Sequence, residues 1–367
     1  MTPGTPQRLP ALDGLRAISI ALVIFGHLVG TRNAPLTATA LHGAAGLGVR
    51  VFFVISGFLI TTLIFAELDR TATISLRDFY VRRTYRIFPA FYAYLAVIGL
   101  LAAFDAVQLL ENDMLAAATY TMNFHRPRAW HLGHLWSLSV EEQFYLLWPA
   151  IVLLARKRGA MVVAALALAA APLIRVGVWV FMPAHRLGIG ETFPTVFDAL
   201  AAGCLLAGIR GKLAENRAYS AFARSWLFVL VPIVAVGAGL VPRVSFNLAV
   251  GSTLQNIGIA LTVDWAVRRV APSSRFAGKL LDARPLVWIG RLSYSLYLWQ
   301  QPFVNREGTH WVQAWPFNLL AAVAMAMASY YLVEQPFLRL RERRARTKIR
   351  LIGAAVPQTP SRSTPET

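Results

Sequence analysis

Residues 46–66 read GLGVRVFFVISGFLITTLIFA, a run in which Arg50 is the single charged side chain. An apolar stretch of about 17 to 25 residues is long enough to cross the hydrocarbon core of a bilayer as a helix. A chain that crosses a membrane must satisfy its backbone hydrogen bonds internally, which favours helices. The stretch therefore predicts a membrane-spanning helix and an all-α integral membrane protein.

Further stretches of similar composition extend this prediction to a bundle of about ten transmembrane helices. The expected spans are residues 15–29, 46–66, 87–104, 136–155, 160–182, 193–209, 225–241, 246–267, 286–304 and 314–337. The segment 114–124 is too short to cross and is expected to form an interfacial or re-entrant helix.

The composition of the whole chain agrees with a membrane location. The 367 residues are 56% hydrophobic and 15% charged, and 36 Lys and Arg against 18 Asp and Glu give a formal net charge of +18. Of the basic residues, 26 fall in the two terminal segments and the connections on one side, and six in the connections on the other. Cytoplasmic segments carry such an excess, so we expect cytoplasmic termini and no nucleic-acid partner.

The chain divides into two expected parts. Residues 1–338 hold all the spans, whereas residues 339–367 pass from a basic run into a Pro- and Ser-rich segment and are expected to form a disordered cytoplasmic tail. The first apolar stretch contains Arg16 and His27 and lacks a small-residue cleavage site, so we expect no removable signal peptide. The single cysteine, Cys204, excludes a disulfide framework within one chain.

Arg16 and His27 are ionisable residues in the first expected span. They are eleven residues apart, within about 20° of a whole number of helical turns, so both lie on one face, separated by roughly 16 Å along the axis. Ionisable groups at membrane depth are costly unless paired or hydrated, and they commonly mark a functional cavity. The alternative is that Arg16 extends to the cytoplasmic headgroups and His27 marks the far interface.

The fourth expected span begins with polar side chains on one helix face. Ser137, Glu141 and Tyr145 are spaced i, i+4 and i+8. Because this helix enters from the outer side, we expect Glu141 at a depth similar to that of His27. The alternative is an interfacial belt in which Trp136 anchors the helix and the acidic side chains face water.

A histidine-rich loop precedes that span. His125, His131 and His134 lie in it together with Trp130. Their spacing matches no structural-zinc pattern, so we expect a hydrogen-bonded loop and no metal site.

Arg82, Arg83 and Arg86 precede the third expected span, where Pro89 fits the first helical turn. Guanidinium groups form paired, charge-assisted hydrogen bonds with phosphate oxygens. The cluster therefore predicts a phosphate-binding site. The alternative is a cytoplasmic anchor of the positive-inside kind.

Together, these segments resemble the acyltransferase family 3 of bacterial integral-membrane enzymes over residues 12–338. The similar motifs are Leu12-Asp13-Gly14-Leu15-Arg16-Ala17 followed by His27, GVRVFFVISGFLI at 48–60, Arg82-Arg83 through Pro89, HLWSLSVEEQFY at 134–145, FDAL at 197–200 and EQPF at 334–337. Two positions depart from the family pattern: Arg50 stands where many members carry an acid, and Gln300 replaces a frequent histidine. We therefore expect no proton transfer at position 300, although the Gln300 amide can hydrogen-bond a substrate.

The resemblance implies a ten-helix O-acyltransferase of the bacterial cytoplasmic membrane. Such an enzyme moves an acyl group, usually acetyl, from acyl-CoA to a hydroxyl of a carbohydrate, a glycolipid or a small secondary metabolite. Acyl-CoA is a substrate, so no bound cofactor is expected, and the partners are the donor, the acceptor and membrane lipids.

The resemblance also implies roles for the polar residues. Arg16, His27 and Glu141 form the catalytic set, with His27 as general base and Glu141 orienting or charging its imidazole. The phosphates of CoA are expected at Arg82, Arg83 and Arg86, and the acceptor beside Trp136 or Ser137.

Two other classes of protein are compatible with the composition. A transporter or flippase of a lipid-linked or glycan substrate also needs a bundle with a polar pathway, but it predicts no dependence on acyl-CoA. A membrane scaffold would not explain why Arg16, His27 and Glu141 lie within the spans, where ionisable side chains cost free energy.

Overall fold

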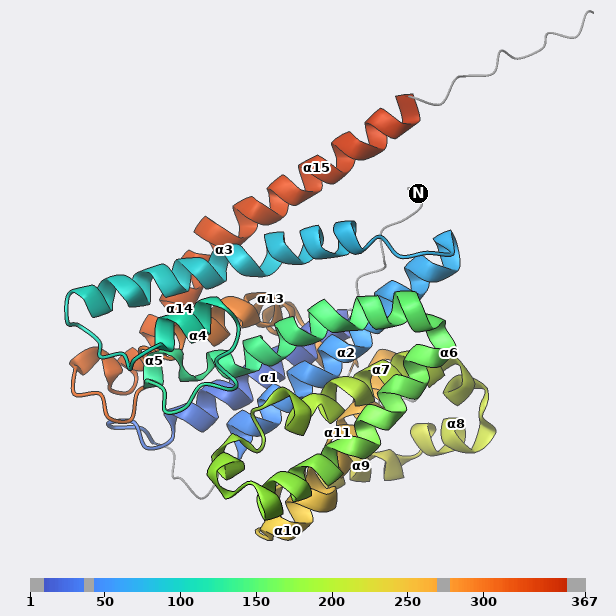
Figure 1. The fold of residues 1–367 in the computed structure, drawn as a ribbon, viewed down its shortest axis with the longest axis horizontal. Helices are drawn as coiled ribbons and strands as arrows, with labels where there is room; N and C mark the ends of the chain where they lie inside the picture. The colour runs from blue at the N-terminus through green and yellow to red at the C-terminus, as the bar shows by residue number, and fades with distance from the viewer. Residues whose placement is uncertain (1–9, 36–42, 269–277, 355–367) are drawn as a thin grey trace, which may run out of the picture.

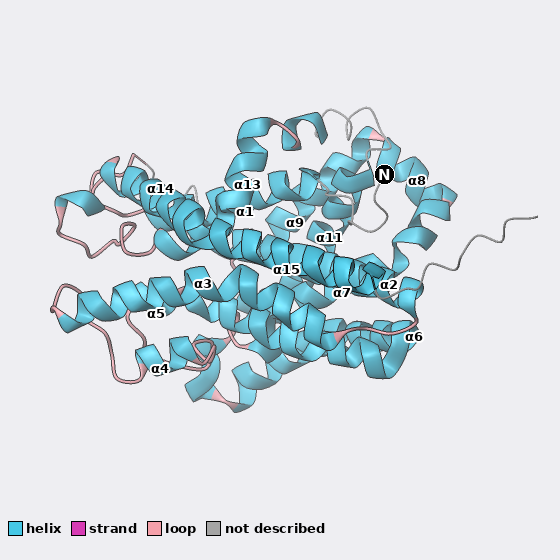
Figure 2. Cartoon of the chain, turned by 90° about the horizontal axis from the view of Figure 1, so that it is seen from above, coloured by secondary structure: helices cyan, strands magenta, loops and turns pink. Residues whose placement is uncertain are grey.

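The structure is a computed structural model that describes residues 10–35, 43–268 and 278–354. Within those residues the chain is helical and contains no strand (Figure 2), which confirms the predicted all-α class. The helices are α1 Pro10–Leu28, α2 Ala44–Thr71, α3 Leu76–Ala103, α4 Asp113–Ala118, α5 Trp130–Gly133, α6 Leu135–Phe181, η1 Pro183–Gly188, α7 Phe193–Glu215, α8 Arg217–Arg224, η2 Trp226–Val229, α9 Leu230–Leu240, α10 Val244–Phe246, η3 Asn247–Gly251, α11 Ser252–Arg268, α13 Arg284–Trp299, η4 Trp311–Gln313, α14 Phe317–Ser329, η5 Tyr330–Glu334 and α15 Gln335–Ala354.

Seven helices in the described part of the chain are long and apolar enough to cross a membrane. The count becomes eight when Arg217–Arg224 and Trp226–Leu240, which meet at an angle of 79°, are taken as one bent span. Eight is two fewer than the expected ten. The two segments that are not counted as separate spans are the second arm of α6 and the helix α13.

Helix α6 covers two of the expected spans. Its 47 residues correspond to about 70 Å of helix, more than twice the thickness of a hydrocarbon core of about 30 Å. The backbone leaves the helical conformation at Arg156, where φ is 58° and ψ is −178°, and Figure 1 shows α6 folding back on itself there. Helix α13 has 16 residues and covers the first part of the expected span 286–304.

Close helix packing at glycine builds the centre of the bundle. Helix α7 packs against α2 and α6, and α1 packs against α2 and α13. A Cβ atom on Gly57 of α2 would lie 2.1 Å from the Leu200 carbonyl oxygen, and one on Gly203 of α7 would lie 2.1 Å from the Val54 carbonyl oxygen. Both contacts exclude a side chain, and small residues of this kind let membrane helices approach closely.

Helix α3 begins earlier than the sequence suggested. Ser75 caps it by accepting a hydrogen bond from the Asp78 amide, so the helix starts at Leu76 and Pro89 lies inside it. The arginine cluster at 82–86 is therefore part of a helix and not of a loop. A helical segment also replaces part of the expected tail, because α15 extends through Ala354, whereas residues 355–367 lie outside the described residues.

Candidate functional site

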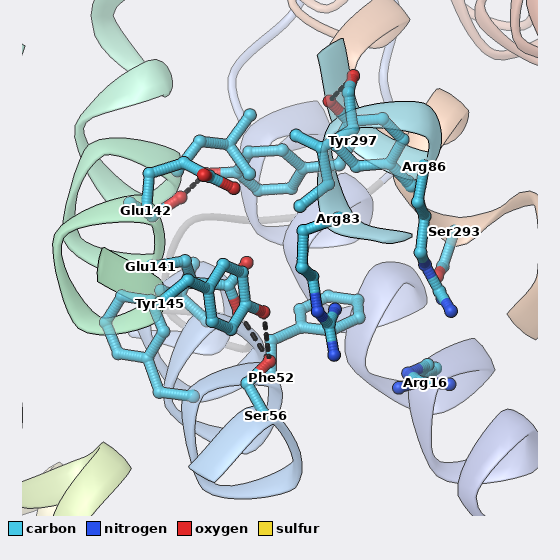
Figure 3. Close-up of a pocket in the computed structure, with 16 residues that line it drawn as sticks. Arg16, Phe52, Ser56, Arg83, Arg86, Glu141, Glu142, Tyr145, Ser293 and Tyr297 are labelled. Atoms are coloured by element: carbon cyan, nitrogen blue, oxygen red, sulfur yellow. Dashed lines mark hydrogen bonds between the residues drawn. The ribbon is translucent and has the colours of Figure 1, made fainter. Parts of the chain in front are cut away.

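A cavity of about 100 Å³ lies where α1, α2, α3, α6 and α13 meet (Figure 3). Arg16 of α1 and Arg83 and Arg86 of α3 contribute its positive charge, and Glu141 and Glu142 of α6 line it as well. We call it the arginine cavity. The structure thus brings together residues from three separate sequence motifs.

The three guanidinium groups gather on one side of the arginine cavity (Figure 3). Arg16 Nη1 lies 3.3 Å from Asp13 Oδ1, and the side chain of Arg16 is 16% exposed. The guanidinium carbon of Arg83 lies 4.7 Å from the centroid of the Tyr145 ring. Among the described side chains, no carboxylate oxygen lies within 4.0 Å of the Arg83 or Arg86 guanidinium nitrogens. Arg83 is half-buried, and a charge in that position is costly without a partner, so the arrangement suits an anionic ligand.

Arg82 does not belong to this cavity. Its side chain is 50% exposed, its Nη2 lies 3.3 Å from Glu67 Oε2, and neither residue lines the cavity. The sequence grouped Arg82 with Arg83 and Arg86 because the three arginines are close together in the chain. In the structure Arg82 is paired with Glu67 instead.

The carboxylate side of the cavity is organised by Ser56 of α2. Ser56 donates a hydrogen bond of 2.6 Å to Glu141 Oε1, and the Tyr145 hydroxyl donates to Ser56 Oγ at 3.2 Å. Glu141 and Tyr145 belong to the polar helix face that the sequence predicted, whereas Ser56 was not singled out. Its place inside an apolar span is the signal that could have identified it.

A second and larger cavity, of about 1260 Å³, lies beside the first. His27, Trp130, His134 and Trp136 line it, together with the connection at 187–192, and we call it the histidine chamber. It contains side chains of the loop that the sequence marked as rich in histidine. Among the described residues, no three His, Cys, Asp or Glu side chains lie close enough to hold a metal ion.

Two connections that line the chamber are joined by ion pairs. Arg126 and Arg128 both bind the Glu191 carboxylate. Burial lowers the pKa of the Arg128 guanidinium, and the charge of Glu191 opposes that shift. One of the two positive charges in this part of the chamber is therefore compensated by a protein carboxylate.

His27 has a different partner from the one that the sequence suggested. Its Nδ1 lies 3.0 Å from Gln300 Oε1, and its ring stands edge-on to Trp130 with the ring centroids 5.7 Å apart. Glu141 lines the arginine cavity and is bonded to Ser56, so the expected contact between Glu141 and His27 is wrong. Similar depth in two helices does not set which faces meet. Because α1 packs against α13, Gln300 at the end of α13 takes the position beside the imidazole.

The two cavities adjoin. Val49 and Tyr297 line both of them, and the Tyr297 hydroxyl lies 2.5 Å from Ser137 Oγ and donates to the His134 carbonyl at 2.8 Å. The neighbouring residues Trp136 and Ser137 therefore divide between the two cavities: Trp136 lines the histidine chamber and Ser137 the arginine cavity. Sequence reasoning missed Val49 because a valine in an apolar span carries no signal of its own.

Arg50 is held apart from both cavities. Its guanidinium donates to Asn256 Oδ1 and Ser252 Oγ at 3.2 Å each. Nearby, the buried Arg175 pairs with the buried Asp198 at 2.9 Å, an ion pair inside the bundle that the sequence did not reveal. These arginines have protein partners, and nothing in the structure gives them a substrate.

Comparison with known proteins identifies the family of the chain. The family model described as an acyltransferase domain, that of the acyltransferase 3 family, matches residues 9–335. The O-acetyltransferase OatA of Staphylococcus aureus is 32% identical over 363 residues, which cover 90% of this chain and 57% of that protein. The peptidoglycan O-acetyltransferase OatA of Listeria monocytogenes is 28% identical, covering 90% of this chain and 54% of that protein.

A third relative, the putative peptidoglycan O-acetyltransferase YrhL of Bacillus subtilis, is 29% identical and covers 89% of this chain and 54% of that protein. The chain thus spans just over half the length of these relatives. No solved structure matches it. The family model covers nearly the whole chain, and the chain therefore belongs to the acyltransferase 3 family of membrane acyltransferases.

Proposed function

We propose that this protein is a membrane O-acyltransferase that moves an acetyl group from acetyl-CoA to a hydroxyl of a cell-envelope carbohydrate, with peptidoglycan as the first candidate. The observation that carries the proposal is the pair of adjoining cavities, which meet at Val49 and Tyr297. One contains three arginines, of which Arg83 and Arg86 have no carboxylate within 4.0 Å among the described side chains, and the other contains an imidazole. The relatives named O-acetyltransferases supply the reaction class, and those named for peptidoglycan supply the acceptor.

The proposed topology has ten membrane-spanning segments and both termini in the bacterial cytoplasm. Counting the two arms of α6 separately, the bent pair as one span and α13 as a span gives this number. The bend of α6 and helix α8 lie at one end of the bundle and α4 and α5 at the other (Figure 1). The basic residues 156–158 belong to the first end, which supports its assignment to the cytoplasm.

Reporter fusions test this topology. Fusions after Arg158 and after Arg284 are expected to report the cytoplasm, and a fusion within residues 127–133 the outer side. A cytoplasmic signal from the fusion within 127–133 would contradict the topology.

The arginine cavity receives the donor in this proposal. Arg83 and Arg86 bind phosphate oxygens of CoA through charge-assisted hydrogen bonds. The acyl end of acetyl-CoA passes beside Arg16, which lines the same cavity. The volume of about 100 Å³ is far smaller than a whole CoA molecule, so the cavity is expected to hold only part of the donor. The thioester then reaches the junction at Val49 and Tyr297.

The histidine chamber receives the acceptor. His27 takes the proton of the acceptor hydroxyl while the hydroxyl oxygen attacks the thioester carbonyl carbon. The carbon–sulfur bond then breaks, and CoA leaves as a thiol after the proton is returned to it. Trp136 and Trp130 offer apolar ring faces for a sugar in the same chamber. Glu141 accepts a hydrogen bond from Ser56 in the arginine cavity and takes no direct part in the proton transfer.

Mass spectrometry of peptidoglycan fragments tests the function. A strain that lacks the protein is compared with its parent and with the deletion strain complemented by the parental chain or by His27→Gln. We expect O-acetylated fragments in the parent and in the strain with the parental chain only. Equal O-acetylation in the deletion strain would refute the peptidoglycan acceptor, and transport of an unmodified glycan without acetyl transfer would refute the enzyme class.

A further inference from the structure

A chain of amide hydrogen bonds leads from His27 to a backbone carbonyl. His27 Nδ1 lies 3.0 Å from Gln300 Oε1, Gln300 Nε2 donates to Gln301 Oε1 at 2.8 Å, and Gln301 Nε2 donates to the Trp130 carbonyl at 2.8 Å. Trp130 Nε1 donates in return to the Gln301 carbonyl at 2.9 Å. Both glutamines are buried. We call this chain the amide relay.

The far end of the amide relay fixes its direction. A backbone carbonyl only accepts, so the Gln301 group that faces Trp130 must be the NH2 group. In this orientation Gln301 Oε1 faces Gln300 and accepts a hydrogen bond from the Gln300 NH2 group. Gln300 Oε1 is then the atom that faces His27. Turning either amide over would set two acceptors or two donors against each other, an arrangement that buried polar groups avoid.

The direction of the relay selects the tautomer of His27. An imidazole that faces an amide oxygen through Nδ1 must donate from that nitrogen, so in the neutral ring Nε2 is left as the acceptor. When Nε2 takes up a proton, the bond from Nδ1 to Gln300 is unchanged. The relay therefore needs no rearrangement during proton transfer.

We propose that Gln300 and Gln301 are positioning residues that hold His27 in the tautomer whose Nε2 accepts the proton of the acceptor hydroxyl. The inference rests on the proposed function, in which His27 is the general base. The amide of Gln300 does not transfer a proton in the reaction. It determines which nitrogen of the His27 ring accepts the proton.

Steady-state kinetics of the purified full chain with acetyl-CoA and isolated peptidoglycan fragments test the relay. Gln300→Met keeps the length of the side chain and removes the acceptor, so kcat is expected to fall by about 10²-fold. The KM for acetyl-CoA is expected to stay within about twofold, because the donor lies in the other cavity. Gln300→Glu in its protonated form retains an acceptor for the Nδ1 hydrogen and an O–H donor to Gln301 Oε1, and it is expected to recover kcat to within about tenfold of the parental value.

Gln301→Met tests the anchor of the relay separately. It removes the donor to the Trp130 carbonyl and frees the Gln300 amide to turn over, and we expect kcat to fall by about tenfold. The double variant with Gln300→Met is expected to be no slower than Gln300→Met alone, because both substitutions act along one path. Gln255→Met is the matched control: Gln255 is a buried glutamine of α11 outside both cavities, and this variant should retain the parental kcat.

The outcomes separate the relay from the function on which it rests. A parental chain that transfers no acetyl group overturns the proposed function and the relay with it. An active parent with parental kcat in Gln300→Met, or equal loss in Gln300→Met and Gln300→Glu, overturns the relay alone. If Gln300→Met does not fold, the kcat values of Gln300→Glu and Gln301→Met, each with a parental melting temperature, decide the question in the same way.

Discussion

The arginine cavity and the histidine chamber share Val49 and Tyr297 but differ in how their arginines and carboxylates are paired. In the arginine cavity, Glu141 is bonded to Ser56 and leaves the arginines of α3 available. In the histidine chamber, the arginines are already bound to Glu191, and His27 faces a neutral amide. In the proposed function, the small cavity offers arginines without a bound carboxylate to the anionic donor, and the large one offers His27 to the acceptor.

The largest effect on the rate of acetyl transfer is expected from substitutions of His27 in the histidine chamber. His27→Ala and His27→Gln are both expected to lower acyl transfer by about 10²- to 10⁴-fold, because loss of a general base typically costs that much. The measurement is the initial rate of acetyl transfer by variants with parental abundance and insertion. A near-parental rate in His27→Gln would return His27 to a packing role.

The next largest effect concerns the arginine cavity. Arg86→Ala is expected to weaken acetyl-CoA binding by about 1.5 to 3 kcal/mol, the usual contribution of a hydrogen bond to a charged group. Arg86→Lys should recover only part of this loss, because an ammonium lacks the planar donor fork. Equilibrium binding of acetyl-CoA to the purified variants measures the effect.

Arg82→Ala is the matched control for Arg86→Ala. Arg82 is exposed and paired with Glu67 outside the cavity, so its removal should change donor affinity by less than about 0.5 kcal/mol. Equal losses in the two variants would show that the cluster acts as a general positive anchor and not as a binding site.

A smaller effect is expected for Glu141→Gln. The amide oxygen can still accept the hydrogen bond from Ser56, so orientation survives the loss of charge, and we expect about a tenfold lower rate. The assay is again initial acetyl transfer. A loss as large as that of His27→Gln would bring Glu141 into the proton transfer itself.

The sequence predicted the all-α class and the long apolar helices because apolar length is a local signal. It also identified Arg16, His27, Glu141 and the arginines near the start of α3 as polar residues of a membrane bundle. It could not pair them correctly. Contact between His27 and Glu141 was inferred from similar depth and from the family resemblance, whereas helix packing places Gln300 beside the imidazole.

Other errors in the prediction arose at helix boundaries. The Ser75 cap lengthens α3, so that Arg82, Arg83 and Arg86 all lie within this helix, and helix α15 continues through Ala354, past the expected start of the tail at residue 339. The amide relay was invisible as well, because it depends on a contact between positions 130 and 301 that no local pattern encodes. Local periodicity therefore predicts elements, and only packing assigns partners.

Binding of acetyl-CoA to purified His27→Gln protein tests most directly whether one cavity binds the donor while the other carries out proton transfer. Isothermal titration of this variant beside the parental chain is expected to give the same Kd within about twofold, although the variant transfers no acetyl group. A Kd weakened as much as in Arg86→Ala would contradict the division, because His27 would then belong to donor binding.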